Sequence, residues 1–203
     1  MKRLTNTQRE VLIGILLGDA SLQTFNNGIT YRLRVLQKNQ EYCKHLYNIF
    51  QNFVTTPPKS ITTKKGETRW YFNTLINPCF RFYGHQFYCQ DSKKKVIKKI
   101  PKSIHKWLTP CSIAYWFMDD GFTKWKKHSK AIRFCTDNFS KREVQLLCDV
   151  FIEKYKIKAK PQKHRKNHYR VYILEESGLD LKNIIFPLLR DEMLYKCPEK
   201  WYN

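Results

Sequence analysis

The feature that most constrains this chain is an apolar segment that occurs twice and carries an acidic residue at the same place each time. Residues 12–20 form the first copy, with Asp19 as the eighth residue, and residues 113–121 form the second, with Asp120 as the eighth. The copies lie about half the chain apart, which is too long for a solenoid repeat and predicts two halves built alike. Each half would then bring one carboxylate to a shared centre.

The charge of the chain indicates a polyanionic partner. Lys and Arg number 38 against 17 Asp and Glu, which gives a formal net charge of +21 in 203 residues. A folded protein with this excess repels itself unless a polyanion neutralises it. Nucleic acid is the first candidate, because contacts of Lys and Arg with phosphate release counterions. An anionic membrane is the alternative, but the sequence has no basic amphipathic helix and no apolar run near about 18 residues.

The cysteine pattern indicates a reducing compartment. Seven cysteines are scattered without a C-x-x-C pair, and no signal-peptide pattern opens the sequence. We expect free thiols that behave mostly as small buried hydrophobes.

Local patterns predict the same order of elements twice. Residues 30–37 alternate, with Leu33 and Val35 on one face and Arg32 and Arg34 on the other, which is typical of a strand with a core side and a cationic side. The first half is also predicted to contain a helix that begins near Thr5 or Thr7, a helix over 40–53, a hairpin of 59–64 and 68–74, and a helix over 79–88. The second half is predicted to contain a helix over 112–120, a strand over 131–136, a helix opened by a capping box at 140–143, a hairpin of 156–163 and 169–174, and a helix from about residue 177. We therefore divide the chain into an N-terminal half over 1–92, a basic linker over 93–106 and a C-terminal half over 107–203.

The two acids are expected at the C-terminal ends of their helices, where the helix dipole disfavours a carboxylate. If the helices lie side by side, Asp19 and Asp120 also repel each other. A divalent cation would relieve this repulsion, and Mg²⁺ accepts one or two carboxylates while it keeps water and phosphate ligands. Gly14 and Gly18 would allow the helices to approach closely. The alternative is that each Asp only begins a turn after a core helix, but the repetition and the positive charge favour a metal site.

A lysine also precedes a proline at the end of each half. Lys98 and Lys99 lie shortly before Pro101, and Lys196 lies two residues before Pro198. Lysines near two metal-binding carboxylates could stabilise negative charge during phosphodiester hydrolysis. Their matched positions distinguish them from ordinary surface lysines.

The motif residues resemble those of the LAGLIDADG homing endonucleases in their double-motif, single-chain form. The resemblance is most specific over residues 108–121, and it extends to residues 31–39, the Pro57-Pro58 pair and residues 193–198. It implies an α+β fold of two pseudo-symmetric αββαββα halves, whose antiparallel sheets form a DNA-binding saddle. The two motif helices are implied to pack together at the central interface.

The resemblance also implies a metal centre. Asp19 and Asp120 would bind the catalytic ions, joined by the backbone carbonyls of Gly18 and Asp119. The cofactor would be Mg²⁺; Mn²⁺ could substitute, and Ca²⁺ would bind without supporting cleavage.

Further catalytic residues follow from the same resemblance. The basic residue that the family places before the proline matches Lys196 in the second half. In the first half the family match favours Lys98 and the internal repeat favours Lys99, and we choose Lys98. The polar residue on a neighbouring strand matches Gln37 and Asp137, although the family more usually has Gln at the second place.

The sheet surfaces are implied to contact DNA. The residues expected in the first half are Arg32, Arg34, Lys38, Lys59, Lys64, Arg69, Tyr71 and Asn73. Those expected in the second half are Arg133, Lys158, Lys160, Lys163, Arg165, Arg170 and Tyr172. Arg would bind guanine and Asn or Gln would bind adenine, while many of the lysines would reach only phosphate.

The function implied by the resemblance is site-specific, metal-dependent hydrolysis of both strands of a long, asymmetric DNA duplex. The enzyme would act as a monomer without an obligate protein partner, and would cut across the minor groove to leave staggered ends. Its role would be intron homing, from a gene within an intron of a mitochondrion or chloroplast, where no transit peptide is needed. Two alternatives use the same scaffold: a maturase that binds intron RNA, and a DNA-binding protein that has lost cleavage. Retention of both acids and both lysines argues against an inactive scaffold.

Overall fold

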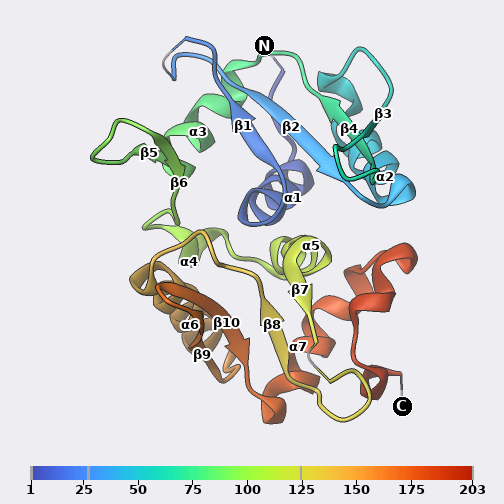
Figure 1. Cartoon of the computed structure of the whole chain (residues 1–203), viewed down its shortest axis with the longest axis vertical. Helices are drawn as coiled ribbons and strands as arrows, with labels where there is room; N and C mark the ends of the chain where they lie inside the picture. The colour runs from blue at the N-terminus through green and yellow to red at the C-terminus, as the bar shows by residue number, and fades with distance from the viewer. Residues whose placement is uncertain (1, 27, 124, 203) are drawn as a thin grey trace.

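The order of elements is the same in the two halves of the chain. The computed structural model describes residues 2–26, 28–123 and 125–202. The first half contains α1 (Asn6–Leu17), β1 (Ser21–Gln23), β2 (Arg32–Gln37), α2 (Gln40–Phe50), β3 (Lys59–Thr62), β4 (Thr68–Asn73) and α3 (Arg81–Phe87). The second half contains α5 (Pro110–Asp120), β7 (Gly121–Phe122), β8 (Ile132–Phe134), α6 (Lys141–Tyr155), β9 (Ala159–Arg165), β10 (His168–Ile173) and α7 (Gly178–Ile185). Each half is therefore an αββαββα unit, and the predicted α+β class is confirmed (Figure 1).

Each half builds one antiparallel sheet, and the two sheets have matching strand orders. The order is β1-β2-β4-β3 in the first half and β7-β8-β10-β9 in the second. Residue patterns alone predicted one strand after each motif helix, and they missed β1 and β7. These strands contain only three and two residues, which is too short for a clear alternation.

The helices α1 and α5 lie side by side at the junction of the halves (Figure 1). A Cβ atom added to Gly14 would lie 2.5 Å from the carbonyl oxygen of Ser112, and one added to Gly18 would lie 2.4 Å from the Cβ of Asp119. The glycines are therefore required for this approach of the two backbones. The predicted packing of the motif helices is confirmed.

Local sequence determines where these helices begin. Thr5 caps α1 through a capping box with Gln8, and Thr109 caps α5 through a capping box with Ser112. Pro110 occupies the first turn of α5, where no backbone donor is needed. The third capping box, predicted at 140–143, opens α6.

The segment predicted as a basic linker over 93–106 contains regular structure. Strand β6 (Val96–Lys98) pairs with β5 (Tyr88–Gln90), and α4 (Ile104–Trp107) follows. The side chain of Asp91 accepts hydrogen bonds from the backbone of Lys93 and Lys95, which forms the turn between the two strands. Tyr88, predicted as the end of a helix, instead begins β5.

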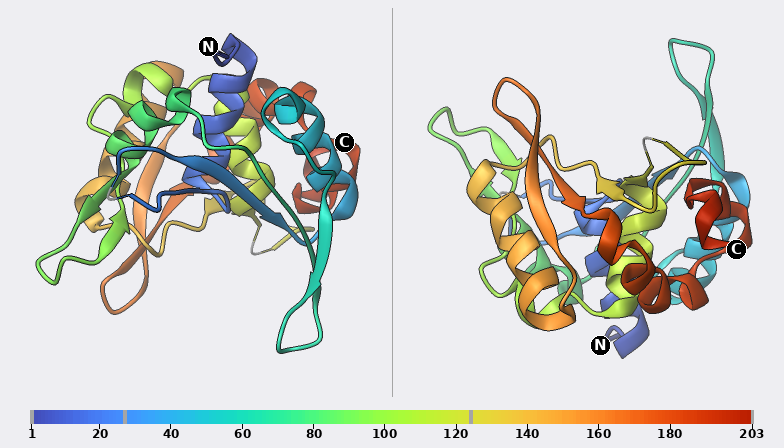
Figure 2. Two further views of the ribbon diagram at one scale, coloured as in Figure 1. Left: turned by 90° about the horizontal axis from the view of Figure 1, so that it is seen from above. Right: turned by 90° about the horizontal axis from the view of Figure 1, so that it is seen from below.

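One continuous core joins the halves, because buried apolar residues of both belong to a single cluster. On β2, Leu33 and Val35 are buried and Arg32 and Arg34 are half-buried on the opposite face, as the alternation predicted. Figure 2 shows the β3–β4, β5–β6 and β9–β10 hairpins projecting toward the same side, to which the C-terminal end of α1 also runs. Within the described residues, no helix is long and apolar enough to cross a membrane.

Candidate active site and nucleic-acid interface

The ends of the two motif helices meet at a small cavity of about 90 Å³. Asp19, Asp120, Lys98 and Asp137 all line it, together with Gly18. A second, wider cavity of about 500 Å³ is lined by Asp120 and Lys196 among others. Five of the residues predicted to act in catalysis therefore lie around one centre, although they come from both halves of the chain.

Asp19 and Asp120 are held in a place that disfavours their negative charge. Burial raises the pKa of Asp120 to about 7, and the like charge of Asp19 adds to this while Lys196 and Lys98 oppose it. Burial also raises the pKa of Asp19, and the same two lysines oppose the shift. A cation bound between the carboxylates would favour their ionised forms.

Each predicted lysine contacts the carbonyl group that precedes one of the acids. The Nζ atom of Lys98 donates to the carbonyl oxygens of Gly18 at 3.0 Å and Ala20 at 2.9 Å. The Nζ atom of Lys196 donates to the carbonyl oxygen of Asp119. Burial lowers the pKa of both amino groups, and the nearby aspartates oppose this shift. Within the described chain, the Lys99 side chain has no hydrogen bond or ion pair, so the contacts favour Lys98 for the first half.

The side chain of Asp119 crosses the interface to the first half. Its Oδ1 atom accepts a hydrogen bond from Nε2 of Gln37 at 3.0 Å, and its Oδ2 atom accepts one from the backbone N–H of Asp19 at 3.1 Å. Gln37 lies on the buried face of β2, with only 5% of its surface exposed. Gln37 is therefore at the site, but its amide binds Asp119. The sequence had suggested a role only for the backbone carbonyl of Asp119. A signal for its side chain was present, because the second motif has Asp119 at the position where the first motif has Gly18.

Asp137, the second predicted polar residue, forms an ion pair with a residue predicted to contact DNA. Its Oδ1 and Oδ2 atoms accept from Nε and Nη2 of Arg170 at 2.9 and 2.7 Å. The hydrogen bond from Arg170 lowers the pKa of Asp137. The two residues therefore neutralise each other beside the cavity that contains Asp120.

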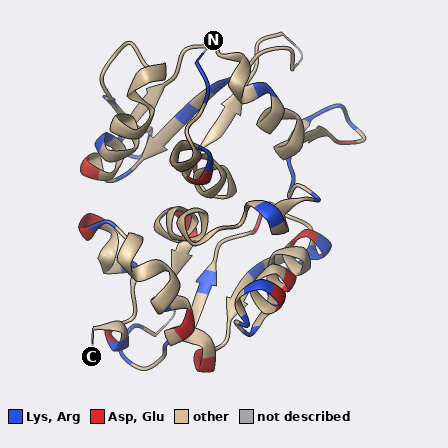
Figure 3. Cartoon of the chain, turned by 180° about the vertical axis from the view of Figure 1, so that it is seen from behind, with Lys and Arg blue, Asp and Glu red and all other residues tan. Residues whose placement is uncertain are grey.

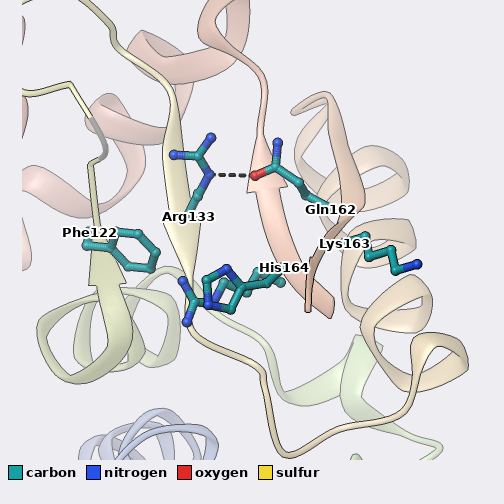
Figure 4. Close-up of a pocket in the computed structure, with 6 residues that line it drawn as sticks. Phe122, Arg133, Gln162, Lys163 and His164 are labelled. Carbon is teal, nitrogen blue, oxygen red and sulfur yellow. Dashed lines mark hydrogen bonds between the residues drawn. The ribbon is translucent and has the colours of Figure 1, made fainter. Parts of the chain in front are cut away.

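Two arginines on equivalent central strands are held by glutamines that sequence analysis missed. Nε and Nη2 of Arg32 donate to Oε1 of Gln23 at 3.1 and 3.0 Å, and Nε of Arg133 donates to Oε1 of Gln162 at 2.6 Å (Figure 4). The guanidinium of Arg133 also lies over the ring of Tyr172, 5.1 Å from its centroid. Such contacts hold each guanidinium group in one orientation.

A cavity of about 410 Å³ surrounds one of these arginines. It is lined by Phe122, Arg133, Gln162, Lys163, His164 and Arg170 (Figure 4). In the first half, the guanidinium of Arg34 lies 5.8 Å from the ring centroid of Tyr71. Asn73, paired with Arg34 in the sheet, has a buried Oδ1 atom without a hydrogen-bond partner.

Most of the other residues predicted to contact DNA lie on or beside the β3–β4 and β9–β10 hairpins, and Lys38 follows β2. Exposed side chains are those of Lys38, Lys59, Lys64, Lys158, Lys160, Lys163 and Arg165. Glu67 forms ion pairs with Lys38 at 3.7 Å and Arg69 at 3.1 Å, and Glu176 forms one with Lys158 at 3.2 Å. Figure 3 shows basic segments in both halves, including the central strands β2 and β8. Ion pairing makes Lys38 and Lys158 weaker candidates for phosphate contact than Lys59 and Lys64, which have no ion pair within the described part of the chain.

Comparison with known proteins identifies the family. The model of the LAGLIDADG DNA endonuclease family matches residues 9–181. This chain belongs to the LAGLIDADG DNA endonuclease family. The predicted resemblance is thus confirmed, and Asp19 and Asp120 are the eighth residues of its two motifs.

Curated proteins similar to this chain include endonucleases and maturases. The chain is 36% identical over 210 residues to DNA endonuclease I-ChuI of Chlamydomonas applanata, with 97% of this chain and 96% of that protein covered. It is 34% identical over 201 residues to cytochrome b mRNA maturase bI2 of Saccharomyces cerevisiae, with 92% of this chain but only 46% of the maturase covered. The chain therefore spans about half the length of that maturase.

Solved structures of other proteins share the fold. Homing endonuclease I-WcaI bound to its DNA recognition sequence has a TM-score of 0.85 and 27% identity, with 97% of this chain and 88% of that chain covered. I-DmoI in complex with DNA and Mn has a TM-score of 0.57 and 15% identity, with 87% of this chain and 94% of that chain covered, and shows the fold alone.

Proposed function

We propose that this protein is a monomeric, site-specific endonuclease that hydrolyses one phosphodiester bond in each strand of a DNA duplex. The observation that carries the proposal is the pair of acids, Asp19 and Asp120, that line one cavity at the junction of two equivalent halves, with a lysine beside each motif end. Two equivalent sheets match a duplex with two strands, and membership of a DNA endonuclease family supports the chemistry.

The donor atoms at the centre fit a hard divalent cation such as Mg²⁺. No group of three or more His, Cys, Asp and Glu side chains gathers around one point in the described residues. Asp19, Asp120 and the carbonyls of Gly18 and Asp119 would thus leave room for water and phosphate ligands, which Mg²⁺ prefers to keep. We propose Mg²⁺ as cofactor, with Mn²⁺ as a substitute and Ca²⁺ as an ion that binds without supporting cleavage.

The bound ion would supply a water of lowered pKa and stabilise charge on the phosphate oxygens. The chain's own residues have separate tasks in the proposal. The carboxylates of Asp19 and Asp120 hold the ion, and Lys98 and Lys196 place positive charge next to the motif ends.

We further propose that the substrate is a long, asymmetric duplex cut across the minor groove with staggered ends. The sheets differ in their contact residues, since Arg34 and Asn73 serve the first and Arg133 and Arg170 the second, so the two half-sites should differ in sequence. We place the gene within an organelle intron, with intron homing as its role. Relatives named as intron-encoded endonucleases support this placement.

The test is cleavage of a plasmid that carries the intron-free allele, in the presence of Mg²⁺. Wild type should linearise the plasmid, while Asp19→Asn and Asp120→Asn should give no linear product and at most a nick. The matched control is Asp180→Asn, which changes an exposed acid on α7 and should cut like wild type. Chelation of the metal should abolish cutting. Equal cutting by all variants would contradict the proposed centre.

One comparison supports RNA binding as a second candidate function, namely the 34% identity to a maturase. The same proteins should therefore be titrated with labelled intron RNA. Binding of this RNA more tightly than the DNA target, without any cutting, would favour the maturase.

A further inference from the structure

The two motifs present their acids from different backbone conformations. Helix α5 continues through Asp120, whereas α1 ends at Leu17, two residues before Asp19. Gly18 adopts φ −95° and ψ −132°, which is outside the helical region, and the N–H of Ala20 returns to the carbonyl of Ile15 at 2.9 Å. The backbone N–H of Asp19 is therefore left out of the helical ladder and needs another acceptor.

The side chain of Asp119 supplies that acceptor from the other half of the chain. Its other oxygen is held by Gln37, so the carboxylate cannot rotate freely. The ring of Tyr42 is fully buried and lies near the same carboxylate. Burial raises the pKa of Tyr42, and the negative charge of Asp119 raises it further. Asp119 therefore links α5, β2 and the end of α1 at one point.

In this packing the second motif can supply such a contact to the first motif, but the first cannot supply one to the second. The residue of the first motif that matches Asp119 is Gly18, and a Cβ there would lie 2.4 Å from the Cβ and 2.6 Å from Oδ2 of Asp119. Positions 18 and 119 therefore cannot both carry a side chain in this packing. The first acid is thus held by a residue of the second half, while Asp120 receives no matching hydrogen bond from any described residue of the first half.

We propose that Asp119 is a positioning residue that fixes the backbone of Asp19 across the interface, and so supports cleavage of one DNA strand more than the other. The inference rests on the proposed function for its catalytic consequence. The contact itself belongs to the free protein and can be tested without DNA or metal.

The first experiment measures hydrogen exchange of the Asp19 amide in the metal-free protein. Asp119→Ala should accelerate this exchange by at least about tenfold, because the acceptor is lost. Asp119→Asn should keep most of the protection, since its side-chain oxygen can still accept from Asp19 while the Gln37 amide turns to face the new N–H group. Unchanged exchange in Asp119→Ala would overturn the proposal.

The second experiment follows each strand of a labelled duplex in single-turnover cleavage. Asp119→Ala should slow one strand by at least about tenfold more than the other, with DNA affinity within about threefold of wild type, while Asp119→Asn retains most of the rate at both strands. The matched control is Ser112→Ala, which removes a buried hydrogen-bonding group at the opposite end of α5. It should lower thermal stability and leave the ratio of the two strand rates unchanged.

The outcomes separate the two proposals. Equal slowing of both strands by Asp119→Ala, in proportion to lost thermal stability as in Ser112→Ala, would overturn the positioning role. Failure of wild type to cut any duplex would overturn the proposed function, and the exchange experiment would still decide whether Asp119 holds Asp19.

Discussion

Single residues at the centre of this molecule bring charges of both signs close together. Partial burial raises the pKa of Asp19 and of Asp120, and it lowers the pKa of Lys98 and of Lys196. The charged forms are tolerated because opposite charges lie close and the amino groups are hydrogen-bonded to carbonyls. Such an arrangement favours catalysis over stability, since the same residues replaced by apolar ones would avoid the desolvation cost.

Neighbouring lysines on one segment offer a sharp test of this centre. Lys98→Ala should lower the single-turnover cleavage rate by about 10²-fold, because the amino group beside Gly18 and Ala20 is lost, while Lys99→Ala should stay within about threefold. The measurement is cleavage of a saturating duplex at fixed Mg²⁺. If Lys99→Ala lowered the cleavage rate more than Lys98→Ala, the active-site lysine of the first half would be Lys99, as the internal repeat indicates.

Packing of two elements, α1 and α5, decides whether the acids can meet at all. Gly14 faces the backbone of Ser112 and the Cβ of Tyr115, neither of which can move without moving a helix. Capping boxes satisfy backbone donors at the N-terminal ends of both helices, so the helices begin at defined residues. The interface therefore sets both the separation and the register of the motif ends.

Unfolding measurements on two glycine variants can distinguish a steric clash between the helices from strain in the backbone. Gly14→Ala should lower the free energy of unfolding by about 3 kcal/mol, because the added methyl group would lie 2.5 Å from a carbonyl oxygen. Gly66→Ala, at φ +80° with open space around it, should cost about 1 kcal/mol through backbone strain alone. Urea unfolding of both variants checks this order. A Gly14→Ala variant as stable as Gly66→Ala would show that the helices can separate at little cost.

The whole molecule presents two equivalent sheets, whose hairpins project to one side, on a chain with a net charge of +21. The half-buried arginines of the central strands are oriented by protein contacts, while most predicted lysines are exposed on the hairpins. We therefore propose that base recognition belongs to the centre of each sheet and phosphate contact to its edges.

Salt dependence of binding tests the cationic surface as a unit. DNA affinity should fall by at least about 10³-fold between about 50 and 200 mM salt, since counterions are released from several phosphates. Lys59→Ala should reduce the slope of log K against log salt by about 1, while Lys44→Ala, an exposed lysine on α2, should not change it. Fluorescence anisotropy at a series of salt concentrations provides the slopes. A flat response in wild type would contradict the DNA-binding surface.

Much of this architecture could be predicted because it depends on local pattern. The repeated apolar segment indicated two equal halves, the alternation over 30–37 separated a core face from a cationic face, and Ser140 marked the start of α6. Strands β1 and β7 could not be found this way, because they are too short to alternate and exist through pairing with β2 and β8. The hairpin of β5 and β6 was missed because a run of lysines conceals its pattern.

Sequence alone determined the two halves, the motif helices and the chemical types gathered in them, since helix periodicity, capping and charge are properties of neighbouring residues. Only the tertiary structure decided which of these residues meet. Asp119 contacts Gln37 and the backbone of Asp19, and Asp137 contacts Arg170, across chain separations that no local pattern encodes. The reason is physical: a buried polar group takes whichever partner the packing of distant elements brings within hydrogen-bond distance, and that choice is made only when the halves close together.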